Sequence, residues 1–400
     1  MNSTKITFVI PSRNNLEFLQ LAYKSIRNLE TKHEILILND ASTDGTQEWI
    51  KSLNDEDLIV HHNPGPERIG IVGMFDKGIE IARTDIIFAF HSDMVAAPDL
   101  DKHVLKHLKK GTVVSATRVE PPLHPDGPEK VIMDFGIEVE DFDMNKFNNW
   151  VNNEYKPKHK TLITEGIFAP WCMYKDDFLA VGGHDELFAP QSKEDSDLFN
   201  RFVLNGYKVL QTWEGLVYHF TSRGSRFNRH SGGAPGKNSE EWLYTTTKNM
   251  RNFIRKWGHM VKHDNLMKPI IPPLYDISFI IKLNHNQKGK LDLLRALEPW
   301  CSRIYTDYPD ILEYVTLEQS HTSMDLKERI YSIEEDIQGQ IIVEINGILF
   351  TQQDFQYVHQ LSEILKDSGT IGSFNLGNLK ITINALDTFE KELIKNKIKK

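Results

Sequence analysis

Two kinds of hydrophobic pattern alternate along the first quarter of the chain. Short, mostly apolar runs of strand length occupy residues 6–10, 34–38, 58–61 and 85–90. Between them, apolar residues recur at helical spacing in residues 16–29, 46–53 and 71–82. A nearly continuous apolar run is typical of a strand that is covered on both faces. Strands that alternate with helices through short connections predict a layered α/β fold around a parallel sheet.

The same pattern continues less regularly as far as residue 258. It predicts strands at residues 113–117, 207–210 and 216–220, one helix that begins at residue 193, and another over residues 240–257. Residues 120–160 are rich in Pro, Asp, Asn and Lys, and we expect them to form an irregular excursion over the surface. Residues 221–237 combine Gly, Ser and Arg, which predicts a loop.

A group of prolines, Pro269, Pro272 and Pro273, interrupts the pattern. Beyond them, strand-like runs alternate with helical stretches up to the end of the chain. A chain of 400 residues is long for one hydrophobic core. We therefore expect a larger domain over residues 1–268 and a smaller C-terminal α/β domain over residues 269–400, in which we find no catalytic motif.

Composition narrows the class of protein. Hydrophobic residues make up 40% of the chain and charged residues 26%, as in ordinary globular domains. A net charge of −9 argues against a nucleic-acid-binding protein. Cys172 and Cys301 form no disulfide or metal-ligand pattern, which suits a reducing cytoplasm. No apolar run approaches the ~18 residues of a membrane span, and only the basic residues 391–400 suggest a peripheral membrane contact.

The run at residues 85–90 ends in a short polar turn, His91-Ser92-Asp93. In open parallel sheets, ligands bind beyond the carboxyl ends of the strands. An Asp at such an end can hold a divalent cation, which in turn can hold a diphosphate. A plain turn capped by Asp93 is the alternative interpretation of this stretch.

Other loops that follow predicted strands carry further polar residues. They are Asp40, Asp44, Glu194, Asp195, His219, Arg223, Arg226 and Arg229. A nucleotide-sugar transferase needs a carboxylate near the base and ribose, a carboxylate that binds the metal, a carboxylate that abstracts a proton, and cationic side chains for the phosphates. The set as a whole therefore points to transfer of a sugar.

Several motifs, in their order and spacing, resemble the inverting family 2 glycosyltransferases, which have the GT-A fold. The motif Asn-Asp-Ala-Ser-Thr-Asp-Gly-Thr at residues 39–46 is similar to the family's Asp-Asp-x-Ser-x-Asp-Gly-Thr. Gly-Gly-His-Asp-Glu at residues 182–186 resembles its Gly-Gly-Phe-Asp-Glu, and Glu194-Asp195 resembles its late Glu-Asp pair. Further matches lie at residues 8–14, 73–82, 206–209 and 248–258. The resemblance covers about residues 5–258 and implies a mixed, mostly parallel, Rossmann-like sheet.

The resemblance also implies roles on the donor side. Asp40 would contact the nucleobase, with Pro11 and Arg13 beside it, and Asp93 would hold Mn²⁺ or Mg²⁺ on the diphosphate. The family's metal motif is Asp-x-Asp, and here His91 and Ser92 precede Asp93. His91 would bind ribose or the metal, since neutral imidazole is itself a ligand. His219 would be a third metal ligand, and Arg223 and Arg226 would close over the diphosphate.

On the acceptor side, the resemblance makes Asp195 the general base, with Glu194 beside it. Trp171 would stack on the acceptor sugar, and Gly183 and His184 would belong to the acceptor site. Each role has a structural alternative. Asp195 could cap a helix, Trp171 could belong to the core, His219 could be a satisfied buried histidine, and the arginines could lie on a solvated loop.

The sequence therefore predicts a cytoplasmic, metal-dependent hexosyltransferase that uses a UDP- or GDP-sugar and a glycan or glycoconjugate acceptor, as in polysaccharide biosynthesis. One alternative, prompted by His91, is a catalytically degenerate protein that binds sugar or nucleotide. Another is a sugar nucleotidyltransferase, which would require a Gly-rich, basic loop directly after the first strand. Pro11-Ser12-Arg13-Asn14 is not such a loop.

Overall fold

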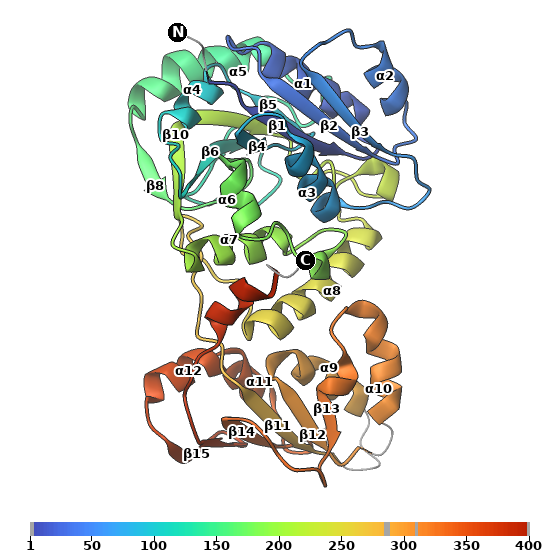
Figure 1. Cartoon of the computed structure of the whole chain (residues 1–400), viewed down its shortest axis with the longest axis vertical. Helices are drawn as coiled ribbons and strands as arrows, with labels where there is room; N and C mark the ends of the chain where they lie inside the picture. Colours follow the sequence, from blue (N-terminus) through green and yellow to red (C-terminus); the bar gives the residue numbers. More distant parts are fainter. Residues whose placement is uncertain (1–3, 284–288, 309–310, 398–400) are drawn as a thin grey trace. The chain divides into compact units, whose positions relative to one another are not determined.

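A computed structural model describes residues 4–283, 289–308 and 311–397 of the chain (Figure 1). These residues form two compact units. Unit 1 contains Met1–Thr246 and His263–Ile270, and unit 2 contains Thr247–Lys262 and Ile271–Lys400. The assignment of catalysis to residues 1–268, and of a separate role to residues 269–400, stays a proposal.

Unit 1 is built on a sheet with the strand order β3-β2-β1-β4-β9-β6-β10-β5, in which β7 also pairs with β6 and β8 with β10. The strands are β1 (Thr7–Ser12), β2 (Glu34–Asp40), β3 (Leu58–Asn63), β4 (Ile86–Ala89), β5 (Met94–Ala96), β6 (Thr112–Glu120), β7 (Val131–Ile132), β8 (Ile163–Glu165), β9 (Trp171–Tyr174) and β10 (Lys208–His219). The four strands β1 to β4 are parallel, and β6 is parallel to β10. Strands β5, β8 and β9 run antiparallel to their neighbours. The expected mixed, mostly parallel α/β fold is confirmed.

Helices cover both faces of this sheet (Figure 1). The helices up to the end of unit 1 are α1 (Leu16–Arg27), α2 (Thr46–Ser52), α3 (Ile71–Ile81), α4 (Leu100–Leu105), α5 (Met144–Trp150), α6 (Lys175–Ala180) and α7 (Glu194–Leu204). The next helix, α8 (Glu240–Trp257), runs from unit 1 into unit 2. Because both faces are covered, every residue of β2 and β4 is buried. This burial explains why these strands appear as mostly apolar runs.

Two stretches of unit 1 differ from the prediction. The strands expected at residues 207–210 and 216–220 form one strand, β10, whose register against β6 shifts between Thr212 and Leu216. The polar Gln211 between them is buried because its amide donates to Thr117 Oγ1 and to the carbonyl of Glu129. The expected excursion at residues 120–160 contains α5, whose Phe147 packs against Tyr218. Aromatic residues at irregular spacing produced no helical period there.

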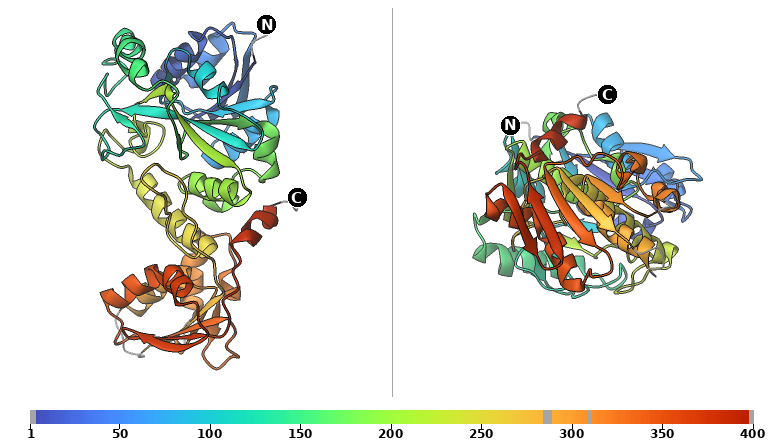
Figure 2. Two further views of the ribbon diagram at one scale, coloured as in Figure 1. Left: turned by 90° about the vertical axis from the view of Figure 1, so that its left-hand side faces the viewer. Right: turned by 90° about the horizontal axis from the view of Figure 1, so that it is seen from below.

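Unit 2 has a second sheet with the strand order β13-β12-β11-β14-β16-β15. The strands are β11 (Ile277–Lys282), β12 (Arg303–Thr306), β13 (Ile330–Ser332), β14 (Ile341–Asn346), β15 (Gly372–Leu376) and β16 (Leu379–Ile383). The helices are α9 (Lys290–Leu297), α10 (Ile311–Glu318), α11 (Gln352–His359) and α12 (Leu361–Ser368), and they gather on one face of the sheet (Figure 2). The expected smaller C-terminal α/β unit is therefore confirmed. Its parallel order β13-β12-β11-β14 is the same as β3-β2-β1-β4 in unit 1.

Within the described residues, none of the helices combines the length and the apolar character that crossing a membrane requires. The basic tail begins in a 3-10 helix at Glu390–Lys397. Residues 398–400 lie outside the described part of the chain, so the expected peripheral membrane contact stays a prediction.

The helix α7 is held in place by Arg201, whose side chain is fully buried. Its guanidinium donates to Asp197 Oδ2 at 2.9 Å and to the carbonyls of Val181 and Gly183 at 2.6 Å each. Gly182 and Gly183 have φ of +83° and +65°, which glycine adopts without the strain that a Cβ brings. The Gly-Gly turn thus sets the position of the whole helix, including its first turn.

We expect Arg201→Met to lower the free energy of unfolding by about 3–5 kcal/mol, because it removes the charged partner of the fully buried Asp197. Arg83→Met is the control, since Arg83 is 65% exposed and lies 3.7 Å from Glu34, so its loss should cost less than about 1 kcal/mol. Chemical denaturation of both variants measures the difference, and equal losses would contradict the role given to Arg201.

Candidate active site

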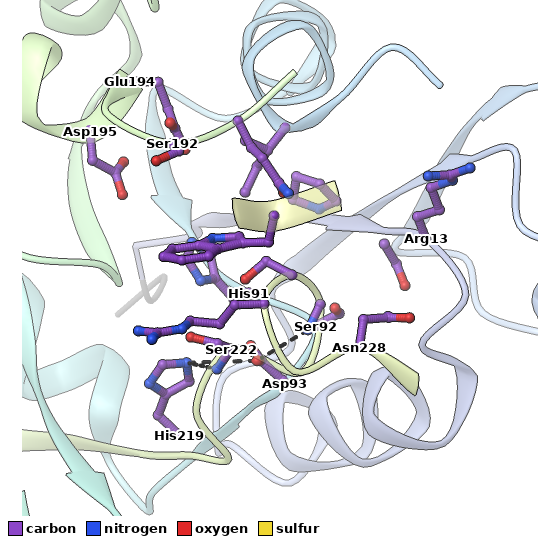
Figure 3. A pocket seen from close by; sticks show the side chains of 18 of the residues that line it. Arg13, His91, Ser92, Asp93, Ser192, Glu194, Asp195, His219, Ser222 and Asn228 are labelled. Atoms are coloured by element: carbon purple, nitrogen blue, oxygen red, sulfur yellow. Dashed lines mark hydrogen bonds and ion pairs between the residues drawn. The ribbon is translucent and has the colours of Figure 1, made fainter. Parts of the chain in front are cut away.

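A cavity of about 490 Å³ opens at the carboxyl ends of β1, β2 and β4. The structure brings most of the predicted site residues to its wall. They are Pro11, Arg13, Asp40, His91, Ser92, Asp93, Glu194, Asp195, His219 and Arg226. In Figure 3, Glu194, Asp195 and Ser192 lie on one side of this pocket, and His91, Asp93 and His219 lie on another.

The residues His91, Asp93 and His219 form a cluster in which one ligand atom of each lies within 4.8 Å of the others. His91 and Asp93 stand in the turn between β4 and β5, and His219 is the last residue of β10. Antiparallel pairing places His219 opposite Met94, directly beside Asp93. Two imidazole nitrogens and one carboxylate oxygen are a donor set that fits Mn²⁺ and related transition metals, and Asp93 and His219 are largely buried. The residues present therefore fit a divalent cation.

The charges of Asp93, His91 and His219 strongly affect one another's pKa. Burial alone would raise the pKa of Asp93, but the facing His219 and His91 and the Arg223 backbone N–H, at 2.6 Å, hold it well below its usual range. Burial would lower the pKa of His219, but Asp93 and Glu120 raise it to about 9. Burial lowers the pKa of His91 despite the nearby carboxylates. Burial thus favours the neutral form of His91, whereas the two carboxylates beside His219 favour positive charge at that position.

The loop after β10 closes against Asp93. Thr221 and Ser222 have φ of +71° and +56°, a strained backbone that turns the amides of Arg223 and Gly224 toward Asp93 Oδ2. The Arg223 side chain points elsewhere, because its guanidinium donates to the Ile137 carbonyl and lies 3.3 Å from Glu138. Arg223 therefore does not offer its side chain to the cavity, contrary to the expectation for a diphosphate ligand.

Arg226 does line the cavity, as predicted. Its guanidinium lies 4.5 Å from the ring centre of Trp242, in the first turn of α8, and donates to Asn238 Oδ1. Stacking of this kind orients the planar guanidinium without neutralising its charge. Trp242 also lines the cavity, but its place at the start of a predicted helix did not mark it as a site residue.

The wall around Asp40 has a structural element that the motif did not reveal. Asp40 Oδ2 accepts from the backbone N–H of Gly70, and Oδ1 accepts from Ile69 N–H and Asn63 Nδ2. Asp40 thus shapes the loop after β3 as well as the cavity. Arg68 from that loop lies 2.6 Å from Glu241, and Arg13 lies 4.0 Å from the same carboxylate. Arg68 and Glu241 were not predicted as site residues, since charged residues in a loop and a helix are common.

Glu194 and Asp195 form the first turn of α7. Burial, together with the negative charge of Asp195, raises the pKa of Glu194 to about 8. Within the described residues, Glu194 Oε2 has no hydrogen-bond partner. Glu194 is therefore the protonated member of the pair at neutral pH, and Asp195 is half-buried at the cavity wall.

The three predicted acceptor residues lie in the core instead of the cavity. Trp171 is 1% exposed and packs on Phe178 and Phe202, because β9 lies between β4 and β6 inside the sheet. The buried His184 has its Nδ1 at 2.7 Å from Asp76, and the Gly183 carbonyl accepts from Arg201. Their positions do not support the expected acceptor contacts: Trp171 packs in the core, and Gly183 and His184 hold the Gly-Gly turn in place.

Comparison with known proteins supports the resemblance. Residues 7–179 match the family model for glycosyl transferase family 2. An undecaprenyl-phosphate mannosyltransferase of Micrococcus luteus is 26% identical over 121 residues, which are 29% of this chain and 49% of that protein. The chain thus spans about half the length of this curated relative.

Solved structures with similar folds include sugar transferases. A crystal structure of GalNAc-T7 with UDP, GalNAc and Mn²⁺ has a TM-score of 0.44 at 13% identity, over 64% of this chain and 51% of that chain. The mannosyltransferase PcManGT of Pyrobaculum calidifontis, with GDP-Man and Mn²⁺, has a TM-score of 0.42 at 15% identity, over 64% of each chain. S. aureus TarS 1–349 with UDP-GlcNAc has a TM-score of 0.40 at 14% identity, over 55% of this chain and 61% of that chain.

The raised pKa of Glu194 makes stability depend on pH. Because its pKa in the folded state, about 8, exceeds the ordinary value of 4.5, Glu194 favours folding fully below pH 4.5, and this contribution is lost as the pH rises through 8. Glutamine stays neutral throughout. We expect Glu194→Gln to match the wild type in unfolding free energy at pH 4 and to exceed it by on the order of 5 kcal/mol at pH 9.

Denaturant titrations across pH 4–9 measure this difference. Glu48→Gln, at an exposed glutamate of α2, is the control and should run parallel to the wild type. A Glu194→Gln curve that is also parallel would contradict the assignment of a proton to Glu194.

Proposed function

Because residues 7–179 belong to glycosyl transferase family 2, we propose that the chain transfers a hexosyl group from a nucleoside-diphosphate sugar to an acceptor hydroxyl, with inversion. One observation carries this proposal. A single cavity at the carboxyl edge of the parallel sheet holds a cluster suited to a divalent cation, His91, Asp93 and His219, together with the carboxylate of Asp195. A glycan or glycoconjugate is the acceptor class that we propose.

On the donor side, His91, Asp93 and His219 would hold Mn²⁺ or Mg²⁺, with the mixed nitrogen and oxygen donors favouring Mn²⁺. When bound there, the cation supplies positive charge to the diphosphate leaving group. Arg226, fixed by its stack on Trp242, adds a second cation at the wall. Asp40, Arg13 and Pro11 form the part of the cavity that we assign to the nucleoside.

On the acceptor side, Asp195 takes the proton of the hydroxyl. The hydroxyl oxygen then forms a bond to the anomeric carbon while the bond from that carbon to the diphosphate oxygen breaks, and the electron pair leaves with the nucleoside diphosphate. Direct displacement from the opposite face inverts the anomeric configuration. Glu194 already carries a proton at neutral pH, so it is not the base, and its neutral form keeps a second negative charge away from Asp195.

Asp195→Asn tests the proposed base. Asparagine keeps the shape of the side chain but cannot accept the proton, so we expect release of nucleoside diphosphate to fall by about 10²–10⁴-fold while donor affinity stays within about threefold. Asp176→Asn is the matched control, a first-turn aspartate of α6 whose side chain is 84% exposed. Turnover of Asp195→Asn at the wild-type rate would refute the role, and release of pyrophosphate by the wild type would indicate a nucleotidyltransferase.

Asp93→Asn tests the donor side. The amide oxygen can still accept from Arg223 N–H, so the fold should persist, but the charge that attracts a cation is lost. In the wild type, UDP or GDP with Mn²⁺ at a hundredfold excess over the dissociation constant should stabilise the fold by about 2.7 kcal/mol. We expect this Mn²⁺-dependent gain to disappear in the variant. Thermal unfolding with and without Mn²⁺ measures it, and an undiminished gain in Asp93→Asn would exclude Asp93 as a metal ligand.

A further inference from the structure

Glu120, the last residue of β6, reaches the metal cluster from a strand that the motifs do not include. Its side chain is 1% exposed, and its Oε1 lies 2.7 Å from His219 Nδ1. The pairing of β6 with β10 sets Val119 opposite Tyr218, so Glu120 and His219 come next to each other. The contact therefore follows from the sheet register and not from a flexible loop.

Two buried cations hold the carboxylate in this position. Arg118 Nη1 donates to Oε1 at 2.9 Å, and Lys130 Nζ donates to Oε2 at 3.0 Å. Their side chains are 8% and 6% exposed. With both oxygens already engaged by cations, Glu120 stays ionised and can only accept a hydrogen bond from His219.

This arrangement determines which nitrogen of His219 faces the cluster. Nδ1 carries the hydrogen that it donates to Glu120, so Nε2, which lies 3.7 Å from Asp93 Oδ2, is the nitrogen left to face a cation; a bound cation would replace any proton on Nε2. The backbone N–H of Ser222 approaches the same Nε2 at 3.4 Å, as it would approach a lone pair. Histidines that bind metals commonly donate their other N–H to a carboxylate in this way.

We propose that Glu120 is a positioning residue, which fixes His219 as the Nδ1–H tautomer with the Nε2 lone pair directed at a divalent cation shared with Asp93 and His91. The proposal rests on the metal cluster of the proposed function. It adds the prediction that the affinity for the cation depends on a carboxylate that does not touch the cation.

A comparison within the chain separates this role from an ordinary buried ion pair. His33 is fully buried, and its Nε2 lies 2.9 Å from Asp101 Oδ2. Its Nδ1 accepts from the backbone N–H of Ile6, so both ring nitrogens are used by the fold. His219 differs because its second nitrogen faces two other potential metal ligands. Asp101→Asn is therefore the matched control for Glu120→Gln.

Titration of the full chain with Mn²⁺, followed by the electron paramagnetic resonance signal of the free ion, tests the proposal. We expect Glu120→Gln to bind Mn²⁺ about 10–100-fold more weakly than the wild type. Asp101→Asn should bind Mn²⁺ as the wild type does, even where its melting temperature falls. Mn²⁺ binding that drops equally in both variants would show a general structural loss and would overturn the proposal.

A second measurement needs no variant and applies even where Glu120→Gln does not fold. Proton–nitrogen correlation spectra of the wild type with Zn²⁺, a diamagnetic substitute, should show His219 with Nδ1 protonated and Nε2 coordinated. Coordination through Nδ1 would overturn the proposal.

His219→Gln separates failure of this proposal from failure of the proposed function. If His219→Gln loses Mn²⁺ and Glu120→Gln keeps it, the metal site stands and the positioning role is wrong. If the wild type itself binds no Mn²⁺, the metal site and the role of Glu120 are both wrong.

Discussion

The pairing of β10 with β5 on one side and with β6 on the other is the constraint on which the candidate site depends. It places His219 beside Asp93, from the turn before β5, and beside Glu120, at the end of β6. The three residues are separated by up to 126 positions in sequence, yet backbone hydrogen bonds of one sheet hold them together. A site built on strand ends is held more precisely than one built on free loops.

Charge balance explains how so many ionisable groups are buried together. A buried carboxylate is costly unless it is paired, and both Asp93 and Glu120 have partners. Asp93 has the backbone amides of the strained loop and the imidazole of His219, and Glu120 has Arg118, Lys130 and His219. Within the described residues, Glu194 Oε2 has no hydrogen-bond partner, and burial together with Asp195 raises the pKa of Glu194 to about 8. Asp93 and Glu194 thus differ in charge, although both line the same cavity.

Much of the fold could be predicted, because burial on both faces leaves a direct trace in the sequence. Strands β1 to β4 and helices α1, α3 and α8 follow from apolar runs and helical spacing. The candidate site was predicted less completely. Four of the site residues follow predicted strands or begin a helix, namely His91, Asp93, Asp195 and His219. Trp171 and His184 looked equally suitable in the sequence, but they lie in the core. The sequence alone does not distinguish an aromatic residue that packs in the core from one that binds a ligand.

The sequence by itself determined the alternation of strands and helices, the presence of two units and the polar residues at strand ends, since these depend on the local spacing of apolar and polar side chains. Only the tertiary structure decided which of those residues meet. The apolar and charged residues around Glu120 follow no periodic pattern. Nothing in the local sequence therefore predicts that Glu120 contacts His219. Likewise, the Arg223 guanidinium forms an ion pair with Glu138, while the Arg223 backbone N–H donates to Asp93. Such contacts depend on strand order and register, which no short window of sequence contains.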